Sequence, residues 1–208
     1  MKTDRDAAIA ALNVSRETAG RLDVFAALLT KWTPRINLIA PKTVGHLWAR
    51  HVLDSAQLVS YAPQDLRLWV DLGSGGGFPG AIVAILLMDS QPDAAVTLIE
   101  SDKRKAAFLR TVARETGAGF TVLAERIEDA APQGADVVSA RALAPLPDLL
   151  GLVERHMKPA GLALLQKGSG HRVEIANALE RWRFDCKTHQ SKTDEEAVVL
   201  EIGGIERV

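Results

Sequence analysis

The stretch from Trp69 to Gly80 constrains the fold more than any other part of the chain, because an apolar run leads directly into a glycine-rich turn. Residues 69–72 predict a buried strand, and Pro79 followed by the apolar run 81–88 predicts the start of a helix. Glycines in such a turn let backbone amides approach a ligand where side chains would collide with it. The stretch therefore predicts a nucleoside-cofactor site, with a glycine-lined surface loop as the alternative.

Asp71, two residues before the first glycine, separates the candidate cofactors. A carboxylate here would repel the pyrophosphate of a dinucleotide, which disfavours a dehydrogenase, whereas it would attract the sulfonium and ammonium cations of S-adenosylmethionine. A second acid, Glu100, ends the predicted strand 95–100, where doubly wound folds bind ribose hydroxyls. A P-loop is excluded because no Gly-Lys-Ser/Thr follows the turn. The two acids therefore favour a class I methyltransferase.

The composition is that of an ordinary globular protein: 208 residues, 47% hydrophobic and 25% charged, with a net charge of −1. Such a chain can bury one sizeable core. No apolar run approaches the ~20 residues that cross a bilayer, and the first residues lack a signal-peptide core, so we expect a cytoplasmic protein without a membrane partner. The single cysteine, Cys186, excludes an intramolecular disulfide and a cysteine-only zinc site. We expect no metal and a monomer.

Basic residues gather in three zones of this nearly neutral chain. Residues 31–51 and 155–173 contain lysine, arginine and histidine but no acid, and residues 103–105 are all basic. These zones predict a face that holds a polyanion through phosphate contacts. Solvated helix faces are the alternative, especially for residues 103–105, which Asp102 and Glu115 flank. The candidate RNA contacts are Lys31, Arg35, Arg50, His51, Lys103, Arg104, Lys167 and Arg172.

The order of predicted elements indicates two parts in one compact unit. Residues 1–63 form an N-terminal helical cap, with one helix from Ser15 to a stop at Pro34 and another capped by Thr43 that closes before Pro63. Residues 64–208 alternate strands and helices, which predicts a class I, Rossmann-like α/β fold with a mostly parallel seven-stranded sheet. We expect strands near 67–72, 95–100, 120–124, 135–140 and 161–166, helices near 79–89, 102–116, 146–157 and 172–182, and an antiparallel pair near 184–190 and 196–202.

The residues after the fourth predicted strand limit which atom can accept a methyl group. Residues 139–142 read Ser-Ala-Arg-Ala, where enzymes that methylate an exocyclic base amine use Asp/Asn-Pro-Pro-aromatic. Cys186 lies far along the chain from this segment, which disfavours attack through a pyrimidine carbon, and no acid adjoins Arg141 to activate a ribose hydroxyl. A ring nitrogen with a free lone pair needs no base. Guanine N7 is such an atom.

No catalytic residue is certain under this hypothesis, but two positioning candidates follow from it. Arg141 and Lys167 stand after predicted strands, where they can orient a base or a phosphate through donated hydrogen bonds. The structural alternative is that either one forms an ion pair, for example with Glu128 or Asp71.

The segment Asp71-Leu72-Gly73-Ser74-Gly75-Gly76-Gly77-Phe78-Pro79-Gly80, preceded by Arg50-His51-Val52-Leu53-Asp54-Ser55, resembles the glucose-inhibited division protein B family, the small-subunit ribosomal RNA guanine-N7 methyltransferases. The resemblance covers nearly the whole chain. It implies that the substrate is one guanine in the decoding-region loop of 16S ribosomal RNA, as RNA or in the small ribosomal subunit. A non-catalytic RNA-binding assembly factor and a methyltransferase acting on a small molecule or protein remain alternatives. The further matches are Trp32, Asn37-Leu38, Lys103-Arg104-Lys105, Phe108-Leu109-Arg110, Arg126-Ile127-Glu128, Arg141-Ala142 and Lys167-Gly168.

The same resemblance implies contacts to S-adenosylmethionine from Gly73, Phe78, the Ile127–Glu128 pair and Arg141. Phe78 would be an apolar wall, Glu128 an acceptor near the adenine amine, and Glu100 the ribose anchor. The chain departs from the family at Glu196 and Glu201, in regions that are usually basic, and at Thr33-Pro34. All candidate cofactor residues are Asp71, Gly73, Ser74, Gly75, Gly77, Phe78, Glu100, Ser101, Ile127, Glu128 and Arg141.

Overall fold

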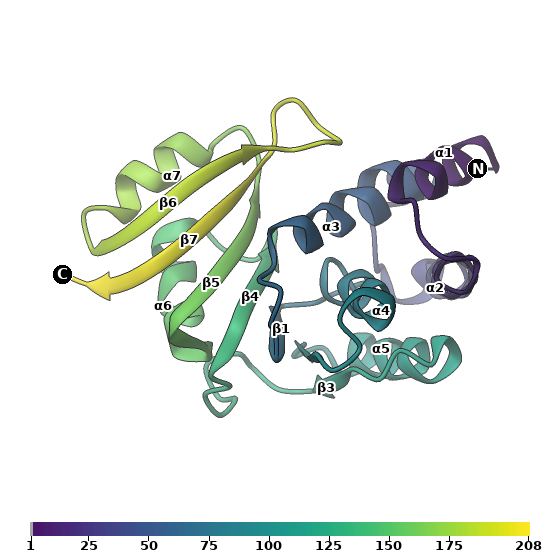
Figure 1. The fold of residues 1–208 in the computed structure, drawn as a ribbon, viewed down its shortest axis with the longest axis horizontal. Helices are drawn as coiled ribbons and strands as arrows, with labels where there is room; N and C mark the ends of the chain where they lie inside the picture. The colour runs from purple at the N-terminus through teal and green to yellow at the C-terminus, as the bar shows by residue number, and fades with distance from the viewer. Residues whose placement is uncertain (1) are drawn as a thin grey trace.

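The computed structural model describes residues 2–208, and its centre is a seven-stranded sheet with the order β3-β2-β1-β4-β5-β7-β6 (Figure 1). β1 to β5 run parallel, and β7 is antiparallel to both β5 and β6. The predicted mostly parallel sheet with a late antiparallel pair is thereby confirmed. The strands are β1 Leu68–Leu72, β2 Ala95–Ile99, β3 Thr121–Leu123, β4 Ala135–Arg141, β5 Met157–Lys167, β6 Trp182–Gln190 and β7 Val198–Arg207.

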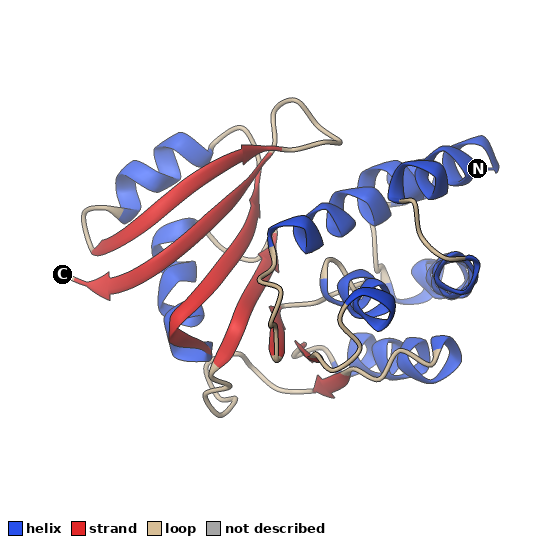
Figure 2. Ribbon diagram, in the orientation of Figure 1, coloured by secondary structure: helices blue, strands red, loops and turns tan. Residues whose placement is uncertain are grey.

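Four crossover helices follow the parallel strands and lie on opposite faces of the sheet (Figure 2). α4 (Gly80–Ser90) and α5 (Lys103–Thr116) pack on the same face as the N-terminal helices, whereas α6 (Leu146–His156) and α7 (His171–Ala178) cover the other face. Alternate residues of β1 serve the two cores: Trp69 joins the first, and Val70 and Leu72 join the second. This alternation is what a strand buried on both faces requires.

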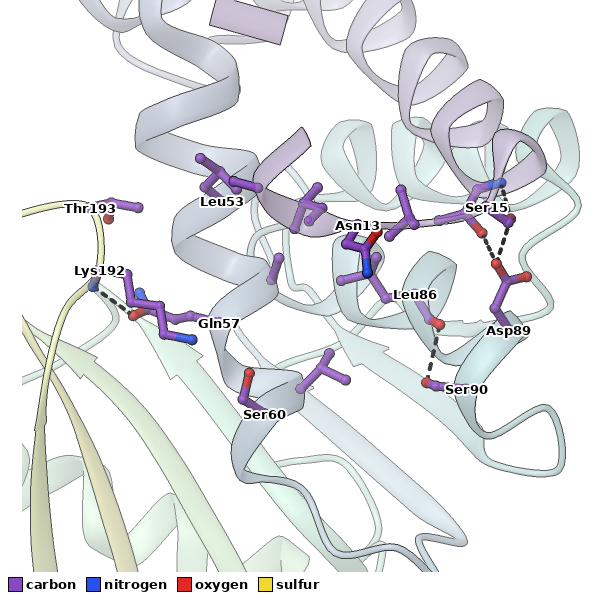
Figure 3. Close-up of a pocket in the computed structure, with 16 residues that line it drawn as sticks. Asn13, Ser15, Leu53, Gln57, Ser60, Leu86, Asp89, Ser90, Lys192 and Thr193 are labelled. Carbon is purple, nitrogen blue, oxygen red and sulfur yellow. Dashed lines mark hydrogen bonds between the residues drawn. The ribbon is translucent and has the colours of Figure 1, made fainter. Parts of the chain in front are cut away.

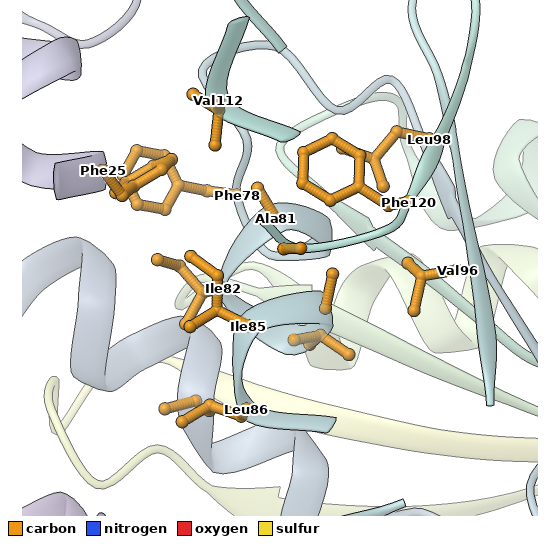
Figure 4. Packing of buried hydrophobic residues seen from close by; sticks show 14 of the residues in the cluster. Phe25, Phe78, Ala81, Ile82, Ile85, Leu86, Val96, Leu98, Val112 and Phe120 are labelled. Atoms are coloured by element: carbon orange, nitrogen blue, oxygen red, sulfur yellow. The ribbon is translucent and has the colours of Figure 1, made fainter. Parts of the chain in front are cut away.

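The first core is organised around α4, which is buried from Gly80 to Leu87. Figure 4 shows Ala81, Ile82 and Ile85 of this helix packed beside Phe25 and Phe78. A helix that is apolar on all sides needs cover on all sides, and here the N-terminal helices supply the cover that the sheet does not. The cap and the first half of the sheet therefore share one hydrophobic core.

The cap begins with α1 (Lys2–Leu12) and α2 (Arg16–Ile36). Ser15 caps α2 as predicted, because its side chain accepts a hydrogen bond from Thr18 N at 3.0 Å. The predicted stop at Pro34 is wrong: the helix continues to Ile36 and ends at Asn37, which has a left-handed φ of 49°. Proline in the last turn removes a single backbone donor, so the helix ends only where Asn37 reverses the chain.

The predicted second cap helix is also wrong in form. The chain instead makes a 3₁₀ helix (Pro41–His46), a π-helix (Trp48–Leu53), the short α3 (Asp54–Ala56) and a 3₁₀ turn (Gln57–Tyr61). Thr43 caps nothing, because its hydroxyl donates to the Ala40 carbonyl at 2.8 Å. Wide π turns are often found at functional sites. This one contains Arg50 to Leu53, and Asp54 and Ser55 follow it at the start of α3.

Several predicted boundaries move by a few residues. β5 starts at Met157 rather than near 161, α7 ends at Ala178 rather than near 182, and β6 starts at Trp182 rather than near 184. β7 runs on to Arg207, since it pairs with β6 along nearly its whole length. None of these shifts alters the order of the strands.

Candidate functional site

The glycine turn after β1 has the backbone that its sequence requires. Gly73, Gly75 and Gly77 have φ values of 66°, 54° and 91°, a region that other residues avoid. The amides of Gly73 and Ser74 both donate to the Ile99 carbonyl, at 2.9 and 3.1 Å. The turn is thus fastened to the end of β2 and faces the crevice beyond the parallel strands.

Glu100 lies beside this turn, as predicted. Its Oε2 accepts from the Gly75 amide at 2.8 Å and its Oε1 from the Asp102 amide at 2.7 Å, so one carboxylate joins the turn to the start of α5. Each carboxylate oxygen retains a second lone pair, which leaves capacity for a hydroxyl donor. Ser101, next to it, is exposed. The ribose contact of Glu100 stays a prediction.

Asp71 is placed differently from the expectation. Its carboxyl group is 0% exposed, and Oδ1 accepts from the Ser139 hydroxyl at 2.6 Å. A Cβ on Gly80 would lie 2.6 Å from Oδ2, so the carboxyl is enclosed beneath the first turn of α4. Burial raises the pKa of Asp71 to about 6. A direct contact to a cation in the crevice is therefore not what the structure shows; the carboxyl supports the turn from below.

Phe78 connects the turn to the cap. It is 4% exposed, meets Phe25 of α2 edge-on at 5.3 Å between ring centroids, and lies 5.0 Å from the His51 ring. The cap touches the turn a second time at Gly76, where an added Cβ would be 2.9 Å from the Leu38 carbonyl oxygen. Phe78 is thus largely covered by protein, and its predicted contact as a cofactor wall stays untested.

Arg141 ends β4 beside this aromatic group. Its guanidinium carbon lies 4.8 Å from the Phe78 ring centroid, and its Nη1 is 3.3 Å from Asp54 Oδ2. The side chain is 19% exposed. Burial lowers the pKa of Arg141, but a guanidinium keeps its proton in proteins. A largely shielded cation therefore stands at the end of β4, beside Phe78 of the glycine turn.

His51 faces Arg141 from the π-helix, with 3.2 Å between Nδ1 and Arg141 Nη2. Since arginine can only donate, Nδ1 must accept, and Nε2 carries the hydrogen that it donates to the Thr43 hydroxyl at 2.9 Å. Burial, with the Arg141 charge second, lowers the pKa of His51 to about 4. The ring is therefore neutral, and both of its nitrogens bond within the protein, where it orients Arg141; its predicted RNA contact stays a prediction.

Asp54 is the functional residue that the sequence analysis missed, since it entered only as part of a matching segment. Its Oδ1 accepts from Gln57 Nε2 at 2.9 Å and from the Thr193 hydroxyl at 3.1 Å. Its Oδ2 accepts from Gln166 Nε2 at 2.7 Å and from Arg141. One carboxylate thus ties the cap to β4, β5 and the loop before β7. The sequence does show that Asp54 follows His51 by three residues. This spacing could not reveal that both side chains reach Arg141, because the chain between them forms an unexpected π turn.

Lys167 is also placed differently from its prediction as an RNA contact. Its side chain is 8% exposed and Nζ donates to the Ala144 carbonyl at 2.6 Å and to Glu174 Oε2 at 2.7 Å. The same Glu174 oxygen accepts from the Leu146 amide at 2.7 Å. The alternative prediction that Lys167 forms an ion pair is therefore confirmed, but its partner is Glu174 and not Glu128 or Asp71. Through these partners Lys167 fixes the loop after β4, and its predicted RNA contact stays a prediction.

A cavity of about 430 Å³ opens next to Arg141, a size that suits a small ligand. It lies between the loop after β4, the end of β5 and the start of β7, and its wall includes Asp54, Gln166 and Lys167. A second cavity, of about 620 Å³, lies farther back between α1, the 57–60 segment and the end of α4 (Figure 3). Only the first is at the carboxyl ends of the strands, where doubly wound folds bind their ligands.

The Ile127–Glu128 pair lies in the loop after β3. Ile127 is 8% exposed and Glu128 is exposed. His156 Nε2 donates to the Ile127 carbonyl at 2.9 Å, and Arg155 donates to the Ala130 carbonyl through Nε at 3.2 Å and Nη2 at 3.0 Å. Two members of the acid-free zone 155–173 thus hold this loop in place. The predicted cofactor contacts of Ile127 and Glu128 stay untested.

The other predicted RNA contacts are exposed. Arg50 pairs with Asp194 at 3.7 Å and Arg104 with Asp102 at 3.2 Å, both at the surface. The remaining exposed candidates are Lys31, Arg35, Lys103 and Arg172.

Within residues 2–208 no group of three or more His, Cys, Asp or Glu side chains is arranged to hold a metal ion. None of the helices described has the length and hydropathy that crossing a membrane would require.

Comparison with known structures identifies the class of fold. A "SAM dependent methyltransferase from Aquifex aeolicus" superposes with a TM-score of 0.57 at 11% identity, over 84% of this chain and 97% of that one. TYW2 from M. jannaschii, solved in complex with AdoMet, gives 0.57 at 13% identity over 76% of both chains. The Rossmann-like class I methyltransferase fold predicted from the sequence is confirmed.

Comparison with known sequences identifies the family of this chain. Proteins named "Ribosomal RNA small subunit methyltransferase G" are 52% identical in Ruegeria sp. (strain TM1040), over 95% of this chain and 96% of the relative, and 50% identical in Cereibacter sphaeroides (strain ATCC 17029 / ATH 2.4.9), over 98% and 99%. The family model for rRNA small subunit methyltransferase G, also called GidB, matches residues 19–199. These matches confirm the resemblance found in the segment from Asp71 to Gly80, and the chain belongs to the rRNA small subunit methyltransferase G family.

Proposed function

We propose that this protein transfers a methyl group from S-adenosylmethionine to N7 of a guanine in the decoding-region loop of 16S ribosomal RNA. The observation that carries the proposal is the position of Arg141. It lies against Phe78 of the glycine turn on one side and lines the 430 Å³ cavity on the other. A donor in that position can hold guanine O6 while the neighbouring N7 faces the turn.

The glycine turn and its neighbours fit the proposed cofactor. The left-handed Gly73 and Gly75 have no side chain to keep a nucleoside away from the backbone of the turn, and Glu100 retains lone pairs beside it. Glu128, exposed on the next loop, supplies an acceptor for the adenine amine. S-adenosylmethionine bound there supplies an electrophilic methyl group on a sulfonium.

The transfer needs no general base. The N7 lone pair forms a bond to the methyl carbon while the carbon–sulfur bond breaks, so the sulfonium becomes a neutral thioether and the positive charge passes to the purine. No proton moves, which agrees with a cavity whose carboxylates, Asp54 and Glu174, already accept hydrogen bonds from the protein. The contribution of the chain is then to align N7 with the methyl group and to exclude water.

The exposed cations give the RNA backbone a place to bind. Lys31 and Arg35 lie near the end of α2, whose following loop touches the glycine turn through Leu38 and Gly76. Lys103 begins α5 directly after β2, at the same edge of the sheet. Cations around the rim of the crevice would hold phosphates while the target base enters it. We infer that the substrate is 16S rRNA or the small subunit, and that the protein acts as a cytoplasmic monomer.

The proposal is tested with methyl-labelled S-adenosylmethionine and small subunits from cells that lack this methylation. Label should appear at N7 of one guanine, located by chemical cleavage of the modified RNA, and ribonuclease should remove it. Transfer that resists ribonuclease would point to a protein or small-molecule acceptor. RNA binding without any transfer would point to an assembly factor, and either outcome would rule out the proposal.

A further inference from the structure

Two polar side chains stand next to each other at the cavity beside the glycine turn. Arg141 and Gln166 are paired in register on the neighbouring parallel strands β4 and β5, and both line the 430 Å³ cavity. Paired residues project from the same face of a sheet, on strands about 4.8 Å apart. Their two polar groups can therefore meet neighbouring atoms of one ligand.

The orientation of the Gln166 amide is decided by Asp54. Gln166 Nε2 donates to the Asp54 backbone oxygen at 2.9 Å and to Asp54 Oδ2 at 2.7 Å. Both atoms are acceptors, so the amide can only face them with its nitrogen. Oε1 must point away from Asp54, and within the described part of the chain it is buried without a hydrogen-bond partner. Gln166 as a whole is 8% exposed.

A buried carbonyl oxygen without a partner is uncommon and calls for an explanation. A bound ligand that donates a hydrogen bond would satisfy it. Arg141 beside it has donors to spare, because its bonds to Asp54 and His51 use two of the five guanidinium hydrogens. The pair therefore presents a donor next to an acceptor.

This arrangement distinguishes the two purines. Guanine has an acceptor, O6, next to a donor, N1–H, whereas adenine has a donor, the 6-amino group, next to an acceptor, N1. We propose that Gln166 reads guanine in this cavity: Oε1 accepts from N1–H while Arg141 donates to O6. N7 lies on the other side of O6 from N1, so both contacts leave its lone pair free. The inference rests on the proposed function and names how that site selects its base.

Wild-type protein tests the inference through substituted substrates. Small subunits are assembled with guanine, inosine or 2,6-diaminopurine at the target position, and kcat/KM for methyl transfer is measured. Inosine keeps O6 and N1–H and should be used within about threefold of guanine. Diaminopurine keeps N7 and the 2-amino group but reverses the donor and acceptor, and should react roughly a hundredfold more slowly, the loss expected for mismatched base contacts. Equal use of diaminopurine, or a large loss with inosine, would overturn the inference.

Gln166→Met then tests the residue itself. It removes the acceptor at similar size, so the guanine-to-diaminopurine ratio should fall by about tenfold or more, through loss of guanine activity. Thr193→Val is the control, because it removes one hydrogen bond to Asp54, where Gln166→Met removes two, and Thr193 lies outside this cavity. Both variants loosen Asp54, and only Gln166→Met should change the base ratio. A ratio that stays the same in Gln166→Met, or changes equally in both, would contradict the assignment.

Failure of the proposed function would be visible separately, as wild-type protein that transfers nothing to guanine. The inference still has a test in that case, and also if Gln166→Met does not fold. Guanosine and diaminopurine riboside are titrated into wild-type protein while the side-chain amide signals of Gln166 are followed by NMR. Selective shifts with guanosine support the reading of the base, and equal or absent shifts overturn it.

Discussion

The Arg141 guanidinium donates from Nη2 to Nδ1 of His51 across 3.2 Å, and this bond decides the state of the imidazole. The chain of donors continues from His51 Nε2 to the Thr43 hydroxyl and from there to the Ala40 carbonyl. Every group in the series donates in one direction, so His51 orients Arg141 as a neutral acceptor, whereas Asp54 is its charged partner. The cap thereby takes part in the geometry of the strand ends.

Replacing His51 should therefore act on the rate. In His51→Phe the ring against Phe78 remains but the acceptor for Arg141 is removed, so the guanidinium should shift and kcat should fall by about tenfold to a hundredfold. Steady-state kinetics with small subunits would measure this. His46→Phe, at an exposed position of the same segment, is the control and should leave kcat unchanged. An unaltered kcat in His51→Phe would show that Arg141 needs no such support.

Asp54→Asn should destabilise the protein. The change leaves Arg141 without its carboxylate and brings an amide donor toward the donors of Gln57 or Gln166, so unfolding in urea should be easier by about 1–3 kcal/mol. The surface pair of Arg50 and Asp194 offers the comparison. Asp194→Asn should change stability by less than about 0.5 kcal/mol. Similar losses in both variants would argue against a central role for Asp54.

Asp71→Asn should alter the pH dependence of stability. Burial raises the pKa of Asp71 from 3.8 to about 6, so the folded protein favours the protonated acid. The resulting contribution to the free energy of unfolding is complete below pH 4 and is lost as the pH rises through 6. An amide has no charge to bury and can still accept from Ser139. The stability of the variant relative to wild type should thus increase between pH 4 and pH 6 by on the order of 2 kcal/mol and then level off. A difference that is constant across this range would contradict the raised pKa.

Gly73→Ala should weaken cofactor binding. Gly73 has a φ of 66°, and an added Cβ would lie at the surface of the turn, 2.6 Å from Leu143 Cδ1. Gly117 is a matched control, because its φ is 68° and no heavy atom lies within 4 Å of an added Cβ. Both alanine variants should lose about 1 kcal/mol of stability through backbone strain. Calorimetry with S-adenosylmethionine should show at least a tenfold loss of affinity for Gly73→Ala alone.

Replacing Lys31 and Arg35 together by alanine should weaken RNA binding at every salt concentration. For each phosphate that the variant no longer neutralises, the slope of log affinity against log salt should become shallower by about 0.7–0.9. Cofactor affinity should stay the same, because neither side chain reaches the turn. Lys187→Ala, which removes an exposed lysine paired with Glu201 on β7, is the control and should leave the slope as it is. A double variant with the wild-type slope would place the RNA elsewhere on the surface.

Glu201, one of the departures from the family pattern, has bonding partners on the neighbouring strand. Its carboxylate accepts from Lys187 Nζ at 2.9 Å and His189 Nε2 at 2.7 Å, both on β6. Glu201, where the resemblance implies a basic region, thus has partners across the two antiparallel strands, which contribute to their pairing. RNA contact by this edge of the sheet receives no support from these bonds.

Local sequence patterns were sufficient to predict the class of fold, the succession of strands and helices along the chain, and the glycine turn. These features depend on apolar runs of strand length, on helix starts, and on glycines that alone adopt the left-handed backbone. The places of Glu100 and Arg141 after strands also identified both residues from the sequence. What each charged group meets could be seen only in the folded chain. Asp71 is enclosed under α4, Lys167 is held by Glu174, and a π turn brings His51 and Asp54 to Arg141. The partners of Asp54 lie up to 139 residues away in the chain, and a charge shows its role only when such partners and its burial are known.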